Sequence, residues 1–495
     1  MELIQLQPAI SEILQARTIW LLFLAMICHW MYKSIYSLYF HPLHNIPGPR
    51  AAAISNIPHC WWFLGGRQPY KMLELHDKYV SFNSAQSWKD IYGARPGHET
   101  FVKGDFYSGG SFAGIGSTSI ISETKPEVHK QMRNYLAGAF SERSVLEQEK
   151  LVAASVDEFI HLVGVLGSQS GGFDASTTLQ SLTFDITGNL AFGEPFGALK
   201  SEKLHPWISV SIEATSQGEI VDVLSRFPIL AKVLPVLLGN RFKRLTQDAK
   251  KNEELCYKTV QSRITRKTER KDFLTRILED RDPSVVTDRD IAAHASDFVI
   301  AGSDTAATTT STAIYYLLRD QSTMSRLTAE IRSTFENYGD INYSSTSALP
   351  YLRAVILEAM RIYPPVPMAL PRIVPNGGDT VDGFFLPAGV TVGTHPIAAS
   401  LASENFHDPW SFKAERWIQP SERDDLDCSQ PFSLGARACL GRNLAWLSLR
   451  TIIAKLIWVY DLELVDTSLQ RFQQARQLTG LAWTDWLRPI RLVFF

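Results

Sequence analysis

An apolar stretch near the N-terminus divides this sequence into two parts that must fold in different surroundings. Residues 18–40 read TIWLLFLAMICHWMYKSIYSLYF, in which Lys33 is the one formally charged residue and His29 is a further polar one. A membrane-spanning helix needs about 20 mostly apolar residues, and aromatic side chains such as Trp30 and Tyr36 suit the membrane interface. We therefore expect residues 1–17 to be a short tail and residues 18–40 to be a transmembrane anchor.

The alternative for this stretch is a cleaved signal peptide. The apolar segment is long for that role, and it ends in aromatic residues instead of a small-residue cleavage site. The next ten residues, 41–50, read HPLHNIPGPR. Prolines at this density prevent helix continuation and stiffen the backbone, which predicts a hinge between a single-pass anchor and a body formed by residues 51–495.

Charge and cysteine usage exclude several classes of protein. The formal net charge of -2 provides no basic excess for neutralising phosphates, so nucleic acid is not expected as a partner. The five cysteines show no CxxC pair and no regular spacing. A disulfide framework or structural zinc site is therefore not expected, and a reducing cytosol suits the body of the protein.

Periodicity predicts a body that is mainly helical with small β-sheets, an α+β fold in one domain. The segment 287–320 has helical periodicity, and Thr287 with Asp290 resembles a capping box at its start. A second helix is expected over 349–362, where Pro350 suits the first turn and Pro364 follows the end. Short strands are expected at 380–385 and 391–393, a loop at 167–172, and a solvated helical face within 241–280.

The most informative segment runs from Phe432 to Gly441 and reads FSLGARACLG. A cysteine that ligates haem iron needs an ionised sulfur, close approach of a planar ring, and protection from water. Gly435 and Gly441 allow the backbone to bend and come near the ring, and Phe432 can cover the sulfur. Arg437 offers a cation to a haem propionate, while backbone N–H groups beside Cys439 can stabilise a thiolate.

This segment resembles the haem-binding signature of the cytochrome P450 family, and further motifs follow in the family's order along essentially the whole chain. Glu358 and Arg361 match its ExxR element, and Arg416 lies in AERW, which is similar to the family's PERF segment. The resemblance implies that these three side chains form a buried ionic triad with a structural role. Ala and Trp replace the family's Pro and Phe in that segment.

Residues of the 287–320 helix and of two other segments complete the resemblance. Asp304 and Thr305 in AGSDT match the family's acid–alcohol pair, which would deliver protons during oxygen activation. His129 and Arg133 match its HxxxR helix, and together with Arg372 they are implied propionate ligands. The implied cofactor is haem b, with Cys439 as the axial thiolate ligand.

The function implied is a monooxygenase that inserts one oxygen atom from O2 into a lipophilic small molecule. Its electrons would come from a separate NADPH–haemoprotein reductase, because too little chain follows Cys439 for a flavin domain. Residues 41–49 and 184–188 look most like fungal members that tailor secondary metabolites. The resemblance suggests the endoplasmic reticulum membrane, with the catalytic body facing the cytosol.

Two other functions stay open at this point. One is a haem-thiolate isomerase or dehydratase acting on peroxides, although Asp304 and Thr305 favour oxygen activation. The other is a haem-binding membrane protein without turnover. Pocket-lining segments are expected at 109–117, 220–238, 298–301 and 366–370, all rich in apolar residues. Asn342 begins a glycosylation sequon that would be a chance match in a cytosolic body.

Overall fold

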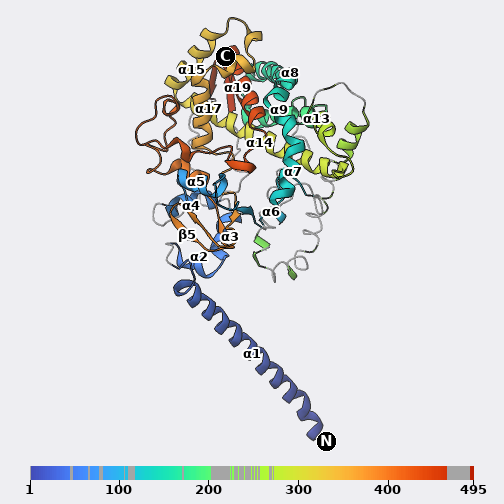
Figure 1. Cartoon of the computed structure of the whole chain (residues 1–495), viewed down its shortest axis with the longest axis vertical. Helices are drawn as coiled ribbons and strands as arrows, with labels where there is room; N and C mark the ends of the chain where they lie inside the picture. Colours follow the sequence, from blue (N-terminus) through green and yellow to red (C-terminus); the bar gives the residue numbers. More distant parts are fainter. Residues whose placement is uncertain are drawn as a thin grey trace.

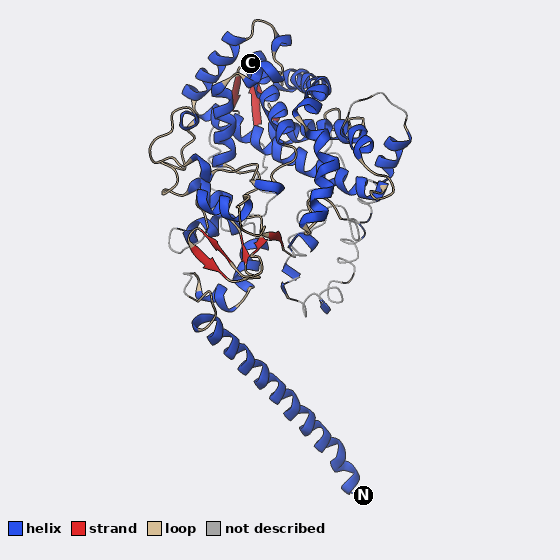
Figure 2. Cartoon of the chain, viewed as in Figure 1, coloured by secondary structure: helices blue, strands red, loops and turns tan. Residues whose placement is uncertain are grey.

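The structure of the protein is a computed structural model. It describes residues 2–44, 48–64, 67–76, 82–104, 106–109, 118–169, 172–201, 257–266, 272–464 and 491–494, with isolated positions between 223 and 254 and at 270. The body is mainly helical, with a few short strands (Figure 2). This confirms the predicted fold class.

A long N-terminal helix, α1 (Glu2–Tyr39), projects away from the body (Figure 1). This one helix includes the predicted tail, from Glu2 onward, and all but the last residue of the predicted anchor. The part from Arg17 to Tyr39 is long and apolar enough to cross a membrane, and none of its most apolar window is buried in the protein. After α1 the chain turns at residues 40–44 and enters the body at Arg50.

The body begins with short helices and then contains most of the long ones. They are α2 (Arg50–Ile54), α3 (Ile57–Leu64), α4 (Gln68–His76), α5 (Ala85–Tyr92), α6 (Phe106–Gly109), α7 (Pro126–Ala137), α8 (Glu142–Gly167), α9 (Ala175–Phe192), α13 (Phe273–Asp280), α14 (Asp288–Arg319), α15 (Gln321–Thr334), α16 (Tyr343–Ser347), α17 (Pro350–Ile362), α18 (Pro396–Leu401) and α19 (Arg442–Val459).

The central helix of the body is α14, which packs against α9, α17 and α19. Thr287 caps its N-terminus in the predicted capping box: the Thr287 side chain accepts from the Asp290 N–H, and the Asp290 carboxylate accepts from the Thr287 N–H. Such a box satisfies backbone donors that would otherwise lack partners. One large apolar core includes residues from both halves of α14 together with α8 and α9. A second core lies between the C-terminal half of α14, α15, α17 and α19.

The described strands form three small antiparallel sheets. Their order is β1-β3-β6, β2-β8-β7 and β4-β5, with bounds β1 (Val102–Lys103), β2 (Phe173–Asp174), β3 (Arg372–Ile373), β4 (Asp379–Val381), β5 (Phe384–Leu386), β6 (Thr391–Val392), β7 (Leu462–Leu464) and β8 (Arg491–Phe494). The strand predicted at 380–385 is a hairpin of two strands, β4 and β5, because Asp382 and Gly383 take positive φ and turn the chain.

Three local predictions need comment. The predicted loop 167–172 begins correctly after α8 at Ser168, although residues 170–171 lie outside the described part of the chain. Parts of 241–280, among them 241–246 and 267–269, also lie outside it. Where that segment is described, the prediction of a solvated face is wrong for Arg263 and Asp272, which are 4% and 0% exposed and form an ion pair. A buried pair of this kind hides its charges from the solvent, and sequence composition cannot show this.

The Asn342 side chain has a structural use. Its Oδ1 accepts from the Ser345 N–H and caps α16, while its Nδ2 donates to the Asp340 carbonyl. A helix cap of this kind explains Asn at this position without glycosylation.

Candidate haem site

Two residues with positive φ, Ser433 and Gly435, shape the backbone of the loop that carries Cys439. Gly435 has φ +70°, and a Cβ there would come 2.1 Å from the Tyr92 carbonyl oxygen. Ser433 also has positive φ, at 56°. A 3₁₀ turn at Gly435–Arg437 follows, and the Cys439 N–H then donates to the Phe432 carbonyl at 2.8 Å. The bend predicted for this loop is therefore present at Gly435.

Gly441 plays a different part from Gly435. It is the N-cap of α19 with φ −82°, an ordinary backbone conformation, and a Cβ there would meet no atom within 4 Å. Its backbone N–H lies against the Cys439 sulfur. Burial raises the pKa of the Cys439 thiol, while the Gly441 N–H and the charges of Arg133 and Arg442 lower it. The Gly441 N–H beside the sulfur thus favours the thiolate, but burial has the larger effect on the pKa of Cys439.

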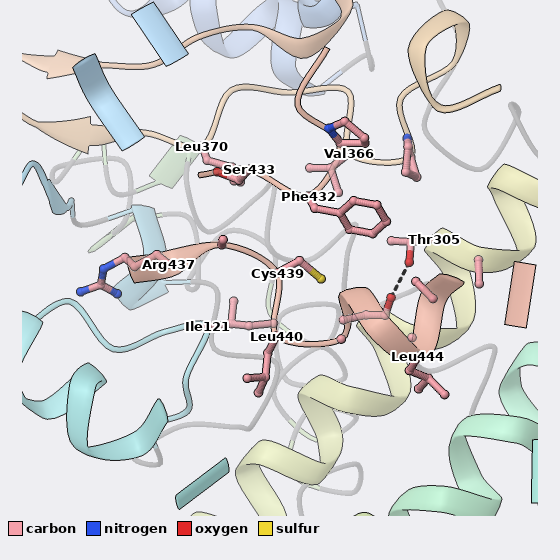
Figure 3. A pocket seen from close by; sticks show the side chains of 18 of the residues that line it. Ile121, Thr305, Val366, Leu370, Phe432, Ser433, Arg437, Cys439, Leu440 and Leu444 are labelled. Carbon is pink, nitrogen blue, oxygen red and sulfur yellow. Dashed lines mark hydrogen bonds between the residues drawn. The ribbon is translucent and has the colours of Figure 1, made fainter. Parts of the chain in front are cut away.

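Cys439 opens onto a cavity of about 380 Å³. Among the described residues that line the cavity it is the one cysteine. Phe432 comes from the same loop, and Thr305 comes from α14 (Figure 3). The side chains of Arg437 and Cys439 leave the loop in opposite directions, which places the guanidinium away from the sulfur (Figure 3).

The rest of the cavity wall is mostly apolar, and two of the predicted lining segments contribute to it. Segment 298–301 supplies Phe298 and Ala301, and segment 366–370 supplies Val366, Met368 and Leu370. Of segment 109–117 all but Gly109, and most of 220–238, lie outside the described residues. A concave apolar wall with a few polar groups is typical of small-molecule sites.

Helix α14 presents Thr305 to the cavity and turns Asp304 away from it. The Thr305 hydroxyl donates to the Ala301 carbonyl at 2.7 Å, yet the α-helix continues without interruption. Asp304 is not among the lining residues, and burial raises its pKa to about 6.

The predicted propionate ligands gather along one part of the cavity wall. Arg437 donates to the carbonyls of Glu123 and Thr124 at 2.7 and 2.9 Å, and Arg133 donates to the Ala438 carbonyl at 2.9 Å. Arg372 is 3% exposed. Burial, followed by the charge of Arg437, lowers the pKa of His129 to about 3, so this imidazole is neutral at ordinary pH.

Sequence reasoning missed two polar residues in this region, Lys103 and Tyr107. Both line the cavity, and both are buried, at 9% and 7% exposure. The Tyr107 hydroxyl accepts from Arg372 Nη1 at 2.8 Å. Neither residue belongs to a motif. The one available signal was the isolated lysine in an apolar segment that reads TFVKGDFY.

Glu358, Arg361 and Arg416 meet in the interior, each no more than 3% exposed. Arg361 donates to both oxygens of Glu358 at 2.7 and 2.8 Å, and Arg416 Nε donates to Glu358 Oε1 at 3.1 Å. Trp417, which stands where the family pattern has Phe, donates its Nε1–H to Glu358 Oε2 at 2.9 Å. Asp424 accepts from Arg416 at 2.6 Å. The departure at Trp417 therefore adds a donor to the cluster.

The residues of the cavity fit a haem group. A single thiol faces the cavity, an apolar wall can cover a planar macrocycle, and buried cations with few acidic neighbours can bind carboxylates. The fold and this donor set define a haem-thiolate protein.

Comparison with known proteins identifies the family. Residues 78–484 match the family model described as Cytochrome P450, so the chain belongs to the cytochrome P450 family, and it is a haem-dependent monooxygenase. The cytochrome P450 monooxygenase ORF11 of Penicillium roqueforti is 48% identical over 87% of this chain and 91% of its own length. The cytochrome P450 monooxygenase BipB of Cochliobolus sativus is 40% identical over 97% and 98%.

A solved structure shares the fold. The crystal structure of the cytochrome P450 CYP102L1 aligns with a TM-score of 0.69 at 19% identity, covering 81% of this chain and 93% of that one. Because the curated relatives are named monooxygenases, the readings as a peroxide isomerase or as a haem protein without turnover are not retained.

The Gly435→Ala variant tests the backbone of the loop. A left-handed conformation costs a non-glycine residue about 1–2 kcal/mol, and the collision with the Tyr92 carbonyl adds to this cost. We expect the ratio of haem to purified protein, measured by the Soret absorbance, to fall several-fold. Gly339→Ala is the control, since a Cβ there meets no atom within 4 Å. Equal haem content in the two variants would contradict this account.

The Trp417→Phe variant tests the added donor on Glu358. Hydrogen bonds to charged groups contribute about 1.5–3 kcal/mol, so we expect a clear fall in the midpoint of thermal unfolding. Trp458→Phe is the comparison, because the Trp458 Nε1–H donates to the neutral carbonyl of Phe335 at 3.1 Å. A larger loss for Trp458→Phe would show that the charge of Glu358 is unimportant here.

Proposed function

We propose that this protein is a membrane-anchored monooxygenase that binds haem b through the Cys439 thiolate and oxidises a lipophilic small molecule. The observation that carries the proposal is the arrangement of one cavity, in which Cys439 and Thr305 come from separate elements, the loop and α14. The bound haem supplies the oxygen chemistry of the reaction. The chain itself holds the cofactor, orients the substrate and moves protons.

Each side chain of the loop and the cationic wall has a role in this proposal. Cys439 is the iron ligand, and Phe432 shields its sulfur from water. Arg437, Arg372, Arg133 and the neutral His129 bind the propionates. Support comes from their shared place on the cavity wall and from the burial of Arg372 and His129.

Thr305 and Asp304 are the proposed proton donors. The Thr305 hydroxyl donates to the Ala301 carbonyl, so its oxygen can accept a hydrogen bond from the cavity side. Rotation of the hydroxyl away from Ala301 would let it donate a proton into the cavity. With a pKa raised to about 6 by burial, Asp304 exchanges protons near neutral pH. Because Asp304 faces away from the cavity, it would supply protons to Thr305 from behind the helix.

The substrate and the pathway are inferred from the cavity wall and the relatives. Apolar side chains such as Phe298, Val366 and Leu370 favour a lipophilic molecule. The relatives are fungal monooxygenases, which supports a tailoring step in a fungal secondary metabolite. A separate NADPH–haemoprotein reductase on the same membrane would supply the electrons.

The proposed location is the endoplasmic reticulum membrane, with α1 spanning it and the body in the cytosol. Helix α3 and the β4–β5 hairpin lie at the end of the body from which α1 emerges (Figure 1). They expose large apolar side chains: Ile57 and Trp61 are each 65% exposed, and Phe385 is also 65% exposed. An exposed apolar surface beside a membrane helix is suited to contact with lipid.

The first test is the spectrum of the reduced, carbon monoxide-bound protein for wild type and Cys439→Ala. We expect the strongly red-shifted Soret band of thiolate ligation in wild type and its loss in the variant. Cys428→Ala is a matched control, because Cys428 is buried elsewhere and does not line the cavity. A band unchanged by Cys439→Ala would remove the central claim.

The second test compares Thr305→Val with Thr310→Val. Both hydroxyls donate to the carbonyl four residues earlier in α14, but Thr310 does not line the cavity. General acid–base catalysis contributes about 10²–10⁴-fold. In a reductase-supported assay on a substrate found by screening for mass gains of one oxygen, we therefore expect Thr305→Val to form at least tenfold less product per NADPH consumed. Thr310→Val should keep its coupling, and equal coupling in both variants would exclude the role of Thr305.

A further inference from the structure

Two buried cations lie directly opposite each other in the sheet beside the cavity. Strands β1 and β3 pair antiparallel, and their register places Lys103 opposite Arg372. Both residues are buried, at 9% and 3% exposure, and both line the cavity. Like charges directly opposite on neighbouring strands destabilise a sheet, and burial increases this cost. The pairing therefore needs a compensating anion.

The described protein residues do not supply that anion. Lys103 Nζ donates to the carbonyls of Ile120 and Ile121 at 3.2 and 2.5 Å. Arg372 donates to the Tyr107 hydroxyl at 2.8 Å and to the Pro371 carbonyl at 2.9 Å. Within the described ranges neither cation forms an ion pair with a carboxylate. Their acceptors are neutral oxygens, so no carboxylate among the described residues is bonded directly to either cation.

The charge state of Lys103 reflects the same imbalance. Burial, followed by the positive charges of Arg437 and Arg372, lowers the pKa of Lys103 to about 7. Asp297 and Glu123 act in the opposite direction but have smaller effects. Burial also raises the pKa of Asp297 to about 7, which makes it a poor counter-ion. An anion bound beside Lys103 would restore its proton and its charge.

We propose that Lys103 is a ligand of the haem propionates, and that with Arg372 and Arg437 it forms a cationic cradle that determines how firmly haem is retained. Haem brings two carboxylates, which match the chemistry that this part of the wall lacks. Tyr107 is a positioning residue in the cradle, because its hydroxyl holds Arg372 Nη1. The inference rests on haem binding by this family member and not on the identity of the substrate.

A competing role for Lys103 is purely structural. Its two bonds to Ile120 and Ile121 hold the segment before α7, where both residues line the cavity. The two roles differ in what they require of the side chain. Holding the segment needs a hydrogen-bond donor, whereas binding propionates needs a positive charge.

Three substitutions separate these roles when haem loss is measured by transfer from the ferric holoprotein to excess apomyoglobin. Lys103→Gln keeps a donor without the charge, Lys103→Met keeps only the aliphatic chain, and Lys103→Arg keeps the charge. We expect Lys103→Gln and Lys103→Met to lose haem roughly ten- to hundredfold faster, as the loss of a charged hydrogen bond implies. Lys103→Arg should stay within a few-fold of wild type.

A second readout is the ferric–ferrous midpoint potential, which should fall in Lys103→Gln because removing a nearby positive charge favours the ferric state. Lys71→Gln, at a partly exposed lysine that pairs with Glu74 and does not line the cavity, is the control for both measurements. Haem loss from Lys103→Gln at the wild-type rate would overturn the proposal. Equally fast loss from all three variants, Arg included, would assign Lys103 to packing and overturn it as well.

The reduced carbon monoxide spectrum is recorded for each variant before the transfer assay. A wild-type protein without the thiolate band would contradict the proposed ligation by Cys439. Intact bands with the rates described above would support the role of Lys103 separately from that claim.

Discussion

The hydrogen bonds and ion pairs of the buried Glu358 carboxylate hold together the chain segments that lead to the Cys439 loop. It accepts from Arg361, Arg416 and Trp417, and so joins α17 to the 3₁₀ turn at Ala414–Trp417. Arg361 also donates to the carbonyls of Ser400 and Pro409, which fixes the chain between α18 and that turn. Removing one partner of such a cluster costs about 3–5 kcal/mol, because a charge is then left uncompensated. The cluster therefore specifies one path for the chain that leads to the Cys439 loop.

The molecule contains a second group of buried cations, and the two groups differ in their balance of charge. In the first, Arg361 and Arg416 face Glu358 and Asp424, so acids and bases are equal in number. In the second, along the cavity, the arginines and Lys103 donate to carbonyl and phenol oxygens. A balanced group can be complete within the protein. A group with excess positive charge is suited to a ligand that brings carboxylates.

Particular residues show how far the sequence predicts this structure. Helix α14 was predictable because Thr287 and Asp290 form a local capping box, and the cysteine loop was predictable because Gly435, Arg437 and Cys439 lie in one short segment. Lys103 could not be found in this way, since its significance arises from its register with Arg372, a residue distant in sequence.

For two residues the structure shows an arrangement that the sequence alone did not predict. Trp417 departs from the family pattern, and only its bond to Glu358 shows that it strengthens the cluster. Asp304 adjoins Thr305 in sequence but faces away from the cavity, because neighbouring residues on a helix point in different directions. Sequence adjacency thus predicted the pair but not its arrangement.

Two parts of the cavity wall favour opposite charges in a bound ligand: a cation beside Cys439, and anions beside Lys103 and Arg437. Burial raises the pKa of the Cys439 thiol, so the sulfur gains most from a bound cation. Along another part of the wall, burial and the charges of neighbouring arginines lower the pKa values of Lys103 and Arg437, to about 7 and about 10, so these groups gain most from bound anions. Haem would bring both an iron cation for Cys439 and carboxylates for the cationic residues, so the chemistry of the wall fits it at both places. Because its binding relieves both costs, it should stabilise the folded chain as a whole, and the same charges that orient the cofactor would then contribute to the stability of the fold.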